Sequence, residues 1–297
     1  MKKEKTITVV SVNWYSSEHI KRLLNNLRNK ADNINALTFM IVDNTNGADV
    51  QLQDAVGEVP FVTILPNEPE RKQRSEAHAS ALDTAMQQLE TSHTLVVDPD
   101  VYIFKKGWDS FCLNEIESGK TSVGAPYPKW KLGKVHDFPS VVFIFARTDW
   151  FTEEGLSWFP FPPLWHRTWN FFVRKVVRLF RFAKRSRLEN SRYMRMVTSG
   201  LEAMTGITSP DTGWHFIKAA KERGDNCTVF QVPYAAELPS DSESMIELAR
   251  NFELFLHNDE PFMSHMYSSG IAYYRTEKGG DPEAWLSAVS EVERSYN

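Results

Sequence analysis

The sequence predicts an α/β fold in which helices flank a mostly parallel sheet. In residues 7–97, short β-rich apolar runs alternate with helix-like stretches, the order that gives parallel strands joined by right-handed crossovers. Several of these runs also end in Asn or Asp, and the carboxyl ends of parallel strands share the edge of a sheet where α/β proteins bind ligands. With 297 residues, the chain is long enough to bury a large core as one domain or two.

The elements of the first hundred residues follow from their local patterns. Residues 7–12 predict a first strand that ends at Asn13, and Ser16-Ser17 then offers an N-cap for a helix whose apolar residues recur at helical spacing. The later elements are a strand at 37–42 closed by Asp43, a strand at 61–65, a helix at 75–89 and a strand at 94–97. Asn13, Asp43, Asn67 and the two acids Asp98 and Asp100 should therefore line one rim of the sheet.

The tetrapeptide Asp98-Pro99-Asp100-Val101 ends a buried apolar run in two carboxylates. Alternation along an extended chain would send Asp98 and Asp100 the same way, so that both could bind one divalent cation or a metal–phosphate group. The alternative is a strand-ending turn with Pro99 at its corner.

Four segments together resemble the family-two glycosyltransferases of the GT-A fold: residues 9–15, 41–44, 77–83 and the Asp-x-Asp motif at 98–100. The resemblance extends over about residues 6–108 and implies a GT-A-like, Rossmann-type fold. It also implies a nucleotide-sugar-binding half at 1–125 and an acceptor-binding half at 126–297. The sequence departs from the family at Ala77 and Asp83, where Gly and Asn are usual.

This resemblance implies a metal-dependent, inverting transfer of a hexosyl or pentosyl group from a nucleoside-diphosphate sugar to an acceptor hydroxyl. A divalent cation, Mn²⁺ or Mg²⁺, would offset the charge on the leaving diphosphate. By the resemblance, Asp100 binds the metal, and Asp98 contacts the metal or the ribose. Asp43 would accept a hydrogen bond from the base, with Asn13 beside it, and His78 would reach the donor phosphates or cap its helix.

An inverting transferase also needs a base for the acceptor hydroxyl, usually a carboxylate. Residues 209–224 resemble the family's acceptor-side helix and indicate Asp211 as that base, although the family's usual Glu-Asp pair is absent. Asp211 would also suit a plain helix cap, with Gly224 ending the helix. Glu202 is the reserve candidate for the base.

A late histidine completes the metal sphere in some GT-A enzymes, and residues 262–270 resemble the segment that carries it. His265 would then be the third metal ligand, and His257 competes for the role. An imidazole ligand favours Mn²⁺ over Mg²⁺.

Residues 165–195 are strongly basic, with ten Lys and Arg residues and one acid in a chain of net charge -4. They are predicted to belong to an insertion at 158–195, in which residues 169–180 carry an apolar stripe at helical spacing. Three interpretations stay open: a helix on the protein's own core with a solvated basic face, docking on an anionic membrane surface, or a polyanionic partner such as nucleic acid. Co-sedimentation with liposomes and with DNA over a salt series separates them.

The composition predicts a cytoplasmic protein, and the basic segment leaves open an attachment at the membrane periphery. Cys112 and Cys227 are too few and too far apart for a disulfide scaffold, and the apolar run at 7–12 is too short for a signal-peptide core or a membrane span. The acceptor is expected to be a glycan, a lipid-linked saccharide or another polymer. Two rivals remain: a GT-A-fold nucleotidyltransferase, disfavoured because residues 13–17 contain no glycine, and a non-catalytic binding module of the same fold.

Overall fold

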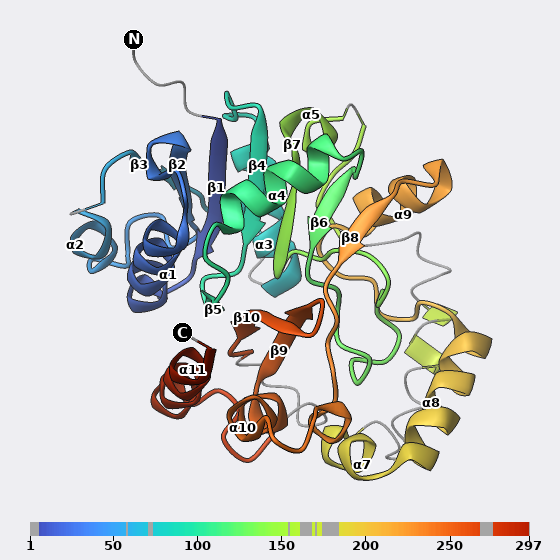
Figure 1. Cartoon of the computed structure of the whole chain (residues 1–297). Coiled ribbons are helices and arrows are strands. Elements are labelled where there is room, and N and C mark those ends of the chain that lie inside the picture. The colour runs from blue at the N-terminus through green and yellow to red at the C-terminus, as the bar shows by residue number, and fades with distance from the viewer. Residues whose placement is uncertain are drawn as a thin grey trace. The chain divides into compact units, whose positions relative to one another are not determined.

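The computed structural model describes residues 6–57, 59–70, 74–153, 155–160, 168–169, 171–173, 184–267 and 276–296. They form a mixed α/β protein built around a mostly parallel sheet, which confirms the predicted fold class (Figure 1). The chain divides into two compact units and passes between them several times. Unit 1 comprises Met1–Ala125, Phe138–Pro160 and Asp211–Val229, and unit 2 comprises Pro126–Asp137, Phe161–Pro210 and Phe230–Asn297.

Unit 1 contains a seven-stranded sheet with the strand order β3-β2-β1-β4-β7-β6-β8. The strands are β1 (Ile7–Asn13), β2 (Leu37–Asp43), β3 (Val62–Pro66), β4 (His93–Val97), β6 (Ser122–Gly124), β7 (Phe143–Arg147) and β8 (Cys227–Val229). Strands β1 to β4 are parallel, whereas β7 runs antiparallel to both β4 and β6. Because β2 and β4 lie on opposite sides of β1, the chain order reverses there, and such a switch point is where α/β sheets bind ligands.

The apolar runs of the sequence account for the core of this unit. All seven residues of β1 are buried, as expected for a central strand, and the helix α1 buries Ile20, Leu23, Leu24 and Leu27 on one stripe. The remaining elements of unit 1 lie between or beside the strands. They are α1 (Ser17–Lys30), η1 (Ile34–Ala36), α2 (Leu52–Val56), α3 (Arg74–Met86), β5 (Val101–Ile103), α4 (Trp108–Glu117), α5 (Thr148–Phe151) and α9 (Trp214–Arg223).

Two predicted helix caps differ from the structure. The side chain of Ser16 makes no capping hydrogen bond to α1; its hydroxyl oxygen accepts from the Trp14 nitrogen, and the hydroxyl donates to Asn13 Oδ1. The N-cap of α9 is Gly213, with a φ of 84°, so Asp211 does not cap this helix. Gly224 ends α9 in the left-handed conformation, as predicted.

Unit 2 is largely helical around one β-hairpin. Its elements are α7 (Arg185–Asn190), α8 (Arg192–Thr205), η2 (Ala235–Glu237), α10 (Glu243–Asn251), β9 (Glu253–His257), β10 (Glu260–His265) and α11 (Pro282–Tyr296). The antiparallel strands β9 and β10 are joined by Asn258 and Asp259, both at positive φ, as tight hairpin turns require. Among the helices that the structure describes, none combines the length and the apolar stretch needed to cross a bilayer.

Part of the basic segment lies outside the described residues, namely 165–167, 170 and 174–183. The predicted helix at 169–180 and the insertion at 158–195 therefore stay predictions. In the described part, Arg185 is not on a solvated face: it is buried, and its guanidinium donates to the carbonyls of Ala249 and Phe252. It also stacks 4.2 Å from the ring centroid of Trp130. At least this one positive charge belongs to the core of unit 2.

Candidate functional site

The carboxyl ends of three strands gather predicted nucleotide-binding residues on one rim of unit 1. Asn13 and Asp43 are the last residues of β1 and β2 and face each other in the strand register. Asp98 directly follows β4, the strand on the other side of β1. We call these three residues the switch-point rim, because they surround the position at which the chain order reverses.

Asp43 is buried and organises the end of its strand through hydrogen bonds. Its Oδ1 accepts from Asn13 Nδ2 at 3.0 Å and from both the backbone nitrogen and the hydroxyl of Thr45, and its Oδ2 accepts from the Gly47 nitrogen at 2.8 Å. Burial by itself would raise the pKa of Asp43, but these hydrogen bonds outweigh it and lower the pKa below its ordinary value. The carboxylate therefore closes the turn after β2, and a contact with a base stays a prediction.

Two exposed aromatic residues follow β1 directly. Trp14 is 49% exposed and Tyr15 is 62% exposed, and their rings meet edge to face at 5.6 Å. Large aromatic side chains are usually more buried than this. Neither residue was among the predicted site residues, although the position directly after a strand of the rim was a signal. Asp49 was also missed, and its Oδ2 accepts the second hydrogen bond of Asn13 Nδ2 at 3.0 Å.

The two aspartates of the Asp-x-Asp motif lie in a turn. Strand β4 ends at Val97 and β5 begins at Val101, so Asp98, Pro99 and Asp100 connect the two strands. The expectation of an extended chain through the motif is therefore wrong, because proline has no backbone N–H to offer to a strand ladder and has a fixed φ. One oxygen of Asp98 and one of Asp100 nevertheless lie within 4.8 Å of each other, so the two carboxylates converge as predicted.

Two histidines lie near this turn. Nε2 of His78, from α3, is 3.8 Å from Asp98 Oδ1, and each of these side chains is about one-fifth exposed. His19, from α1, is within electrostatic reach of Asp100. Burial lowers the pKa of His19 below its ordinary value, and the carboxylate of Asp100 opposes this shift. His78 was among the predicted site residues, whereas His19 was not.

Asp211, the predicted base, is held against the start of α3. Its Oδ1 accepts hydrogen bonds from Ser75 Oγ and from the Thr212 nitrogen, each at 3.0 Å. In return, Thr212 Oγ1 donates to the backbone oxygen of Ser75. Ser75 lies 136 residues away in the chain, so no local pattern could have indicated this contact.

Asp83, one of the departures from the resembled family, has a structural role. It accepts from the Trp158 nitrogen at 2.9 Å and from Ser157 Oγ at 2.7 Å. Burial raises the pKa of Asp83, although both hydrogen bonds act in the opposite direction. The carboxylate thus anchors the segment before residue 160 to α3.

His265, the predicted third metal ligand, belongs to unit 2, where it ends β10. Its Nδ1 lies 2.8 Å from Glu253 Oε2, and the other oxygen of Glu253 lies 2.6 Å from Lys131 Nζ. Although burial opposes it, the ion pair with Lys131, together with His265, lowers the pKa of Glu253 to about 2. The competing histidine, His257, lies on β9, and its ring meets that of Phe230 edge to face, with the centroids 6.3 Å apart. Because Asp98 and Asp100 belong to unit 1, a site that joins them to His265 stays a prediction.

Glu202, the reserve candidate for the base, is engaged within unit 2. Its Oε1 lies 3.0 Å from His136 Nε2 and accepts from the Gly133 nitrogen at 2.5 Å. These contacts make it a link between α8 and the segment 126–137, and a catalytic role stays a prediction.

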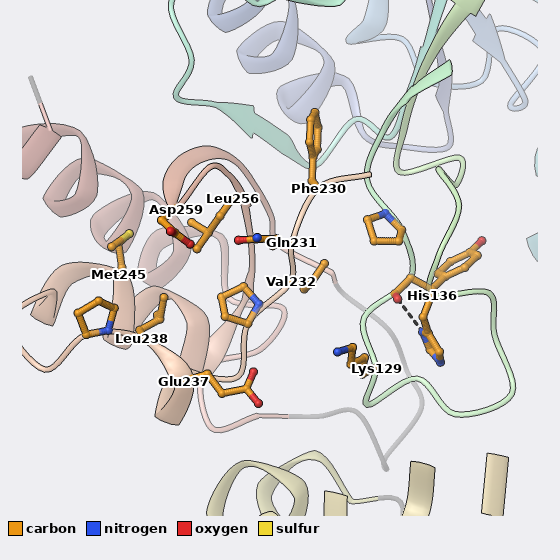
Figure 2. A pocket seen from close by; sticks show the side chains of 14 residues that line it. Lys129, His136, Phe230, Gln231, Val232, Glu237, Leu238, Met245, Leu256 and Asp259 are labelled. Carbon is orange, nitrogen blue, oxygen red and sulfur yellow. Dashed lines mark hydrogen bonds between the residues drawn. The ribbon is translucent and has the colours of Figure 1, made fainter. Parts of the chain in front are cut away.

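A pocket of about 520 Å³ lies within unit 2 (Figure 2). Mainly apolar side chains line it, and one wall holds His136, whose Nδ1 is hydrogen-bonded to the carbonyl oxygen of Tyr127 at 2.7 Å. Its polar lining residues are Lys129, His136, Gln231, Glu237 and Asp259. The volume suits a small ligand, but none of the predicted site residues lines this pocket.

No family model matches the chain, and no curated protein sequence is significantly similar to it. Solved structures show partial similarity. TarS 1–349 from S. aureus is 16% identical over 52% of this chain and 50% of that chain, with a TM-score of 0.38. The same protein in complex with UDP-GlcNAc is 16% identical over 52% of this chain and 48% of that chain, also with a TM-score of 0.38. A third structure is the mannosyltransferase PcManGT from Pyrobaculum calidifontis in complex with GDP-Man and Mn²⁺. It is 13% identical over 84% of this chain and 61% of that chain, with a TM-score of 0.46. The chain thus spans between 48% and 61% of the length of these proteins.

Proposed function

We propose that this protein is a metal-dependent, inverting glycosyltransferase that moves a sugar from a nucleoside-diphosphate sugar to an acceptor hydroxyl. The observation that carries the proposal is the switch-point rim of unit 1. An amide and two carboxylates, on Asn13, Asp43 and Asp98, lie at the carboxyl ends of three parallel strands on both sides of the reversal in strand order. Doubly wound sheets bind nucleotides at this position.

On the donor side, the base and phosphates would be bound by groups on or near the rim. The exposed rings of Trp14 and Tyr15 offer a stacking surface for a base. His78, 3.8 Å from Asp98, offers a donor for a phosphate oxygen. These contacts bind and orient the donor without any change in covalent structure.

The donor set Asp98, Asp100 and His265 fits a divalent cation in its chemistry. Two carboxylates suit a hard cation, and an imidazole shifts the preference from Mg²⁺ toward Mn²⁺. When bound, the cation would supply positive charge at the leaving diphosphate. The aspartates come from one turn of unit 1 and the histidine from the hairpin of unit 2.

On the acceptor side, Asp211 would take the proton of the attacking hydroxyl. Donors from Ser75 and Thr212 hold its carboxylate in one orientation, as a general base requires. The acceptor would be a glycan, a lipid-linked saccharide or another polymer. The basic residues of 165–195 other than the buried Arg185 would attract a membrane surface or a polyanion, including nucleic acid as acceptor.

The test is thermal unfolding of the full chain with UDP, GDP, CDP and ADP, and with UDP-GlcNAc and GDP-Man, each with and without Mn²⁺. A ligand at about 100 times its Kd adds about 2.7 kcal/mol to the free energy of unfolding. We expect one diphosphate and its nucleotide sugar to stabilise the protein only with Mn²⁺, and Asp100→Ala to abolish that effect. The matched control Asp54→Ala, on the exposed surface of α2, should retain it.

Stabilisation by none of the nucleotides would contradict a donor site. Stabilisation that is equal with and without Mn²⁺ would contradict the metal. If the nucleotide binds but neither donor hydrolysis nor transfer follows, the protein is a binding module of the same fold.

A further inference from the structure

Unit 2 contains three polar side chains that are almost completely buried together. Glu253 is 0% exposed, Lys131 is 2% exposed and His265 is 4% exposed. Burying a charge is costly unless it is paired and hydrogen-bonded, so a group of this kind needs an explanation. Neither Glu253 nor Lys131 has a role in the donor or acceptor chemistry proposed above.

The hairpin itself brings the histidine and the glutamate together. His265 on β10 is the antiparallel partner of Glu253 on β9, so the two side chains project on the same face. Glu253 Oε2 lies 2.8 Å from His265 Nδ1. The opposite oxygen, Oε1, lies 2.6 Å from Lys131 Nζ, which also sits 3.4 Å from the ring centroid of Tyr267.

The direction of the hydrogen bond follows from these partners. The carboxylate of Glu253, paired with a lysine ammonium, accepts hydrogen bonds only. His265 Nδ1 must therefore carry the hydrogen, and in a neutral imidazole the lone pair is then on Nε2. Lys131 holds the carboxylate in place through its charge, and therefore acts on the imidazole of His265 only through Glu253.

We propose that Glu253, held by Lys131, is a positioning residue that fixes His265 in its Nδ1–H tautomer and so makes Nε2 the nitrogen available to the divalent cation. This inference rests on the proposed metal site. Outer partners of this kind orient a histidine ligand and raise its basicity, and their removal typically weakens metal binding by about 10–100-fold. An ion pair that merely stabilises the fold would not control the tautomer.

The first experiment determines the tautomer of His265 in the absence of a metal ion. In the ¹⁵N-labelled full chain, long-range imidazole spectra at pH 7.5 should show His265 with Nδ1 protonated, the signal being assigned by its loss in His265→Gln. A His265 signal from the Nε2–H tautomer or from an imidazolium would overturn the proposal, whatever the metal affinity.

The second experiment removes the carboxylate. Glu253→Gln alone would leave the Lys131 ammonium buried and unpaired, so the variant is the double substitution Glu253→Gln with Lys131→Met. The new amide can either accept from Nδ1 or donate to it, so both tautomers should appear. Mn²⁺ affinity, measured from the electron paramagnetic resonance signal of free Mn²⁺, should fall by about 10–100-fold.

The matched control is Glu189→Gln, another buried carboxylate of unit 2, which pairs with Arg185 and accepts from the Ala235 nitrogen. It should change neither the tautomer nor the Mn²⁺ affinity. An unchanged tautomer and affinity in a folded double variant would overturn the proposal. If the double variant does not fold, the tautomer of His265 in the wild-type protein tests the proposal by itself.

The metal site and the role of Glu253 are tested by different outcomes. Wild-type protein that binds no Mn²⁺ overturns the proposed metal site, and this inference with it, even if the Nδ1–H tautomer is present. Mn²⁺ binding with the wrong tautomer overturns only the role of Glu253.

Discussion

Asp43 shows how one carboxylate can organise the end of a strand. Its two oxygens accept hydrogen bonds from Asn13, Thr45 and Gly47, so the turn after β2 and the last residue of β1 are held together. The depressed pKa of Asp43 follows from these donors, which favour the ionised form more than burial disfavours it. A residue on the proposed nucleotide rim is thus also a stability element.

Replacing Asp43 by Asn should destabilise the protein at pH 7 by about 1–3 kcal/mol, because one side of the new amide would point a donor at other donors. Folding lowers the pKa of Asp43 below its ordinary value of 3.8, so its contribution is present above that pH and is lost as the pH falls toward the folded value. Chemical unfolding at pH 7, 4 and 3 should show the difference between wild type and Asp43→Asn shrinking. The exposed control Asp54→Asn should stay within about 0.5 kcal/mol of wild type, and a pH-independent difference would contradict this account.

Replacing Asp211 by Asn should reduce transfer about 10²–10⁴-fold while leaving nucleotide binding unchanged, because only the proton acceptor is lost. Steady-state rates and thermal shifts with the diphosphate measure the two effects separately. Ser75→Ala removes one of the donors to this carboxylate and should cost at most about tenfold. A mild effect of Asp211→Asn would move the assignment of the base to Glu202.

At the scale of elements, helix α9 is bounded by two glycines in the left-handed conformation. Gly213 begins it at a φ of 84°, and Gly224 ends it at 72°. They differ in their surroundings: a Cβ on Gly213 would lie 3.1 Å from the Trp158 ring, whereas nothing lies within 4 Å of a Cβ on Gly224. The start of α9 is therefore fixed by packing as well as by backbone geometry.

Substituting each glycine by alanine separates these two causes. Gly224→Ala should lower the free energy of unfolding by about 1 kcal/mol, the cost of a left-handed alanine. Gly213→Ala should cost about 2–3 kcal/mol, because the buried ring of Trp158 must also shift. Denaturant unfolding measures both values, and equal costs would show that packing against Trp158 plays no part.

At the scale of the whole molecule, the sheet of unit 1 draws on distant parts of the chain. Strand β4 pairs with β1 on one side and with β7 on the other, and β8 comes from beyond residue 225. The predicted donor half, residues 1–125, therefore contains five of the seven strands of this sheet and lacks β7 and β8.

A fragment that ends at residue 125 should not fold cooperatively. It would leave β4 without its antiparallel partner β7, four of whose five residues are buried, and would expose an apolar strand edge. Far-ultraviolet circular dichroism on heating should show a broad transition for the fragment and a sharp one for the full chain. Cooperative unfolding of the fragment would instead support an independent domain at 1–125.

The sequence by itself determined the α/β class and the order of strands and helices in the first hundred residues. Strands predicted at 7–12, 37–42, 61–65 and 94–97 occur within a residue of those positions. Periodicity, strand-ending aspartates and left-handed glycines are local signals, so a short window of sequence contains them. Asn13, Asp43 and Asp98 were predicted to share one rim because the carboxyl ends of parallel strands meet at the same edge of a sheet.

Only the tertiary structure decided what the polar side chains contact. Arg185 resembled a solvated charge in a basic run but is buried against Trp130, and Glu253 gave no signal before the hairpin placed it beside His265. Ser75 and Asp211 meet across 136 residues of sequence. The physical reason is that burial and charge pairing depend on which distant segments pack together, whereas a strand or a turn depends mainly on its own residues.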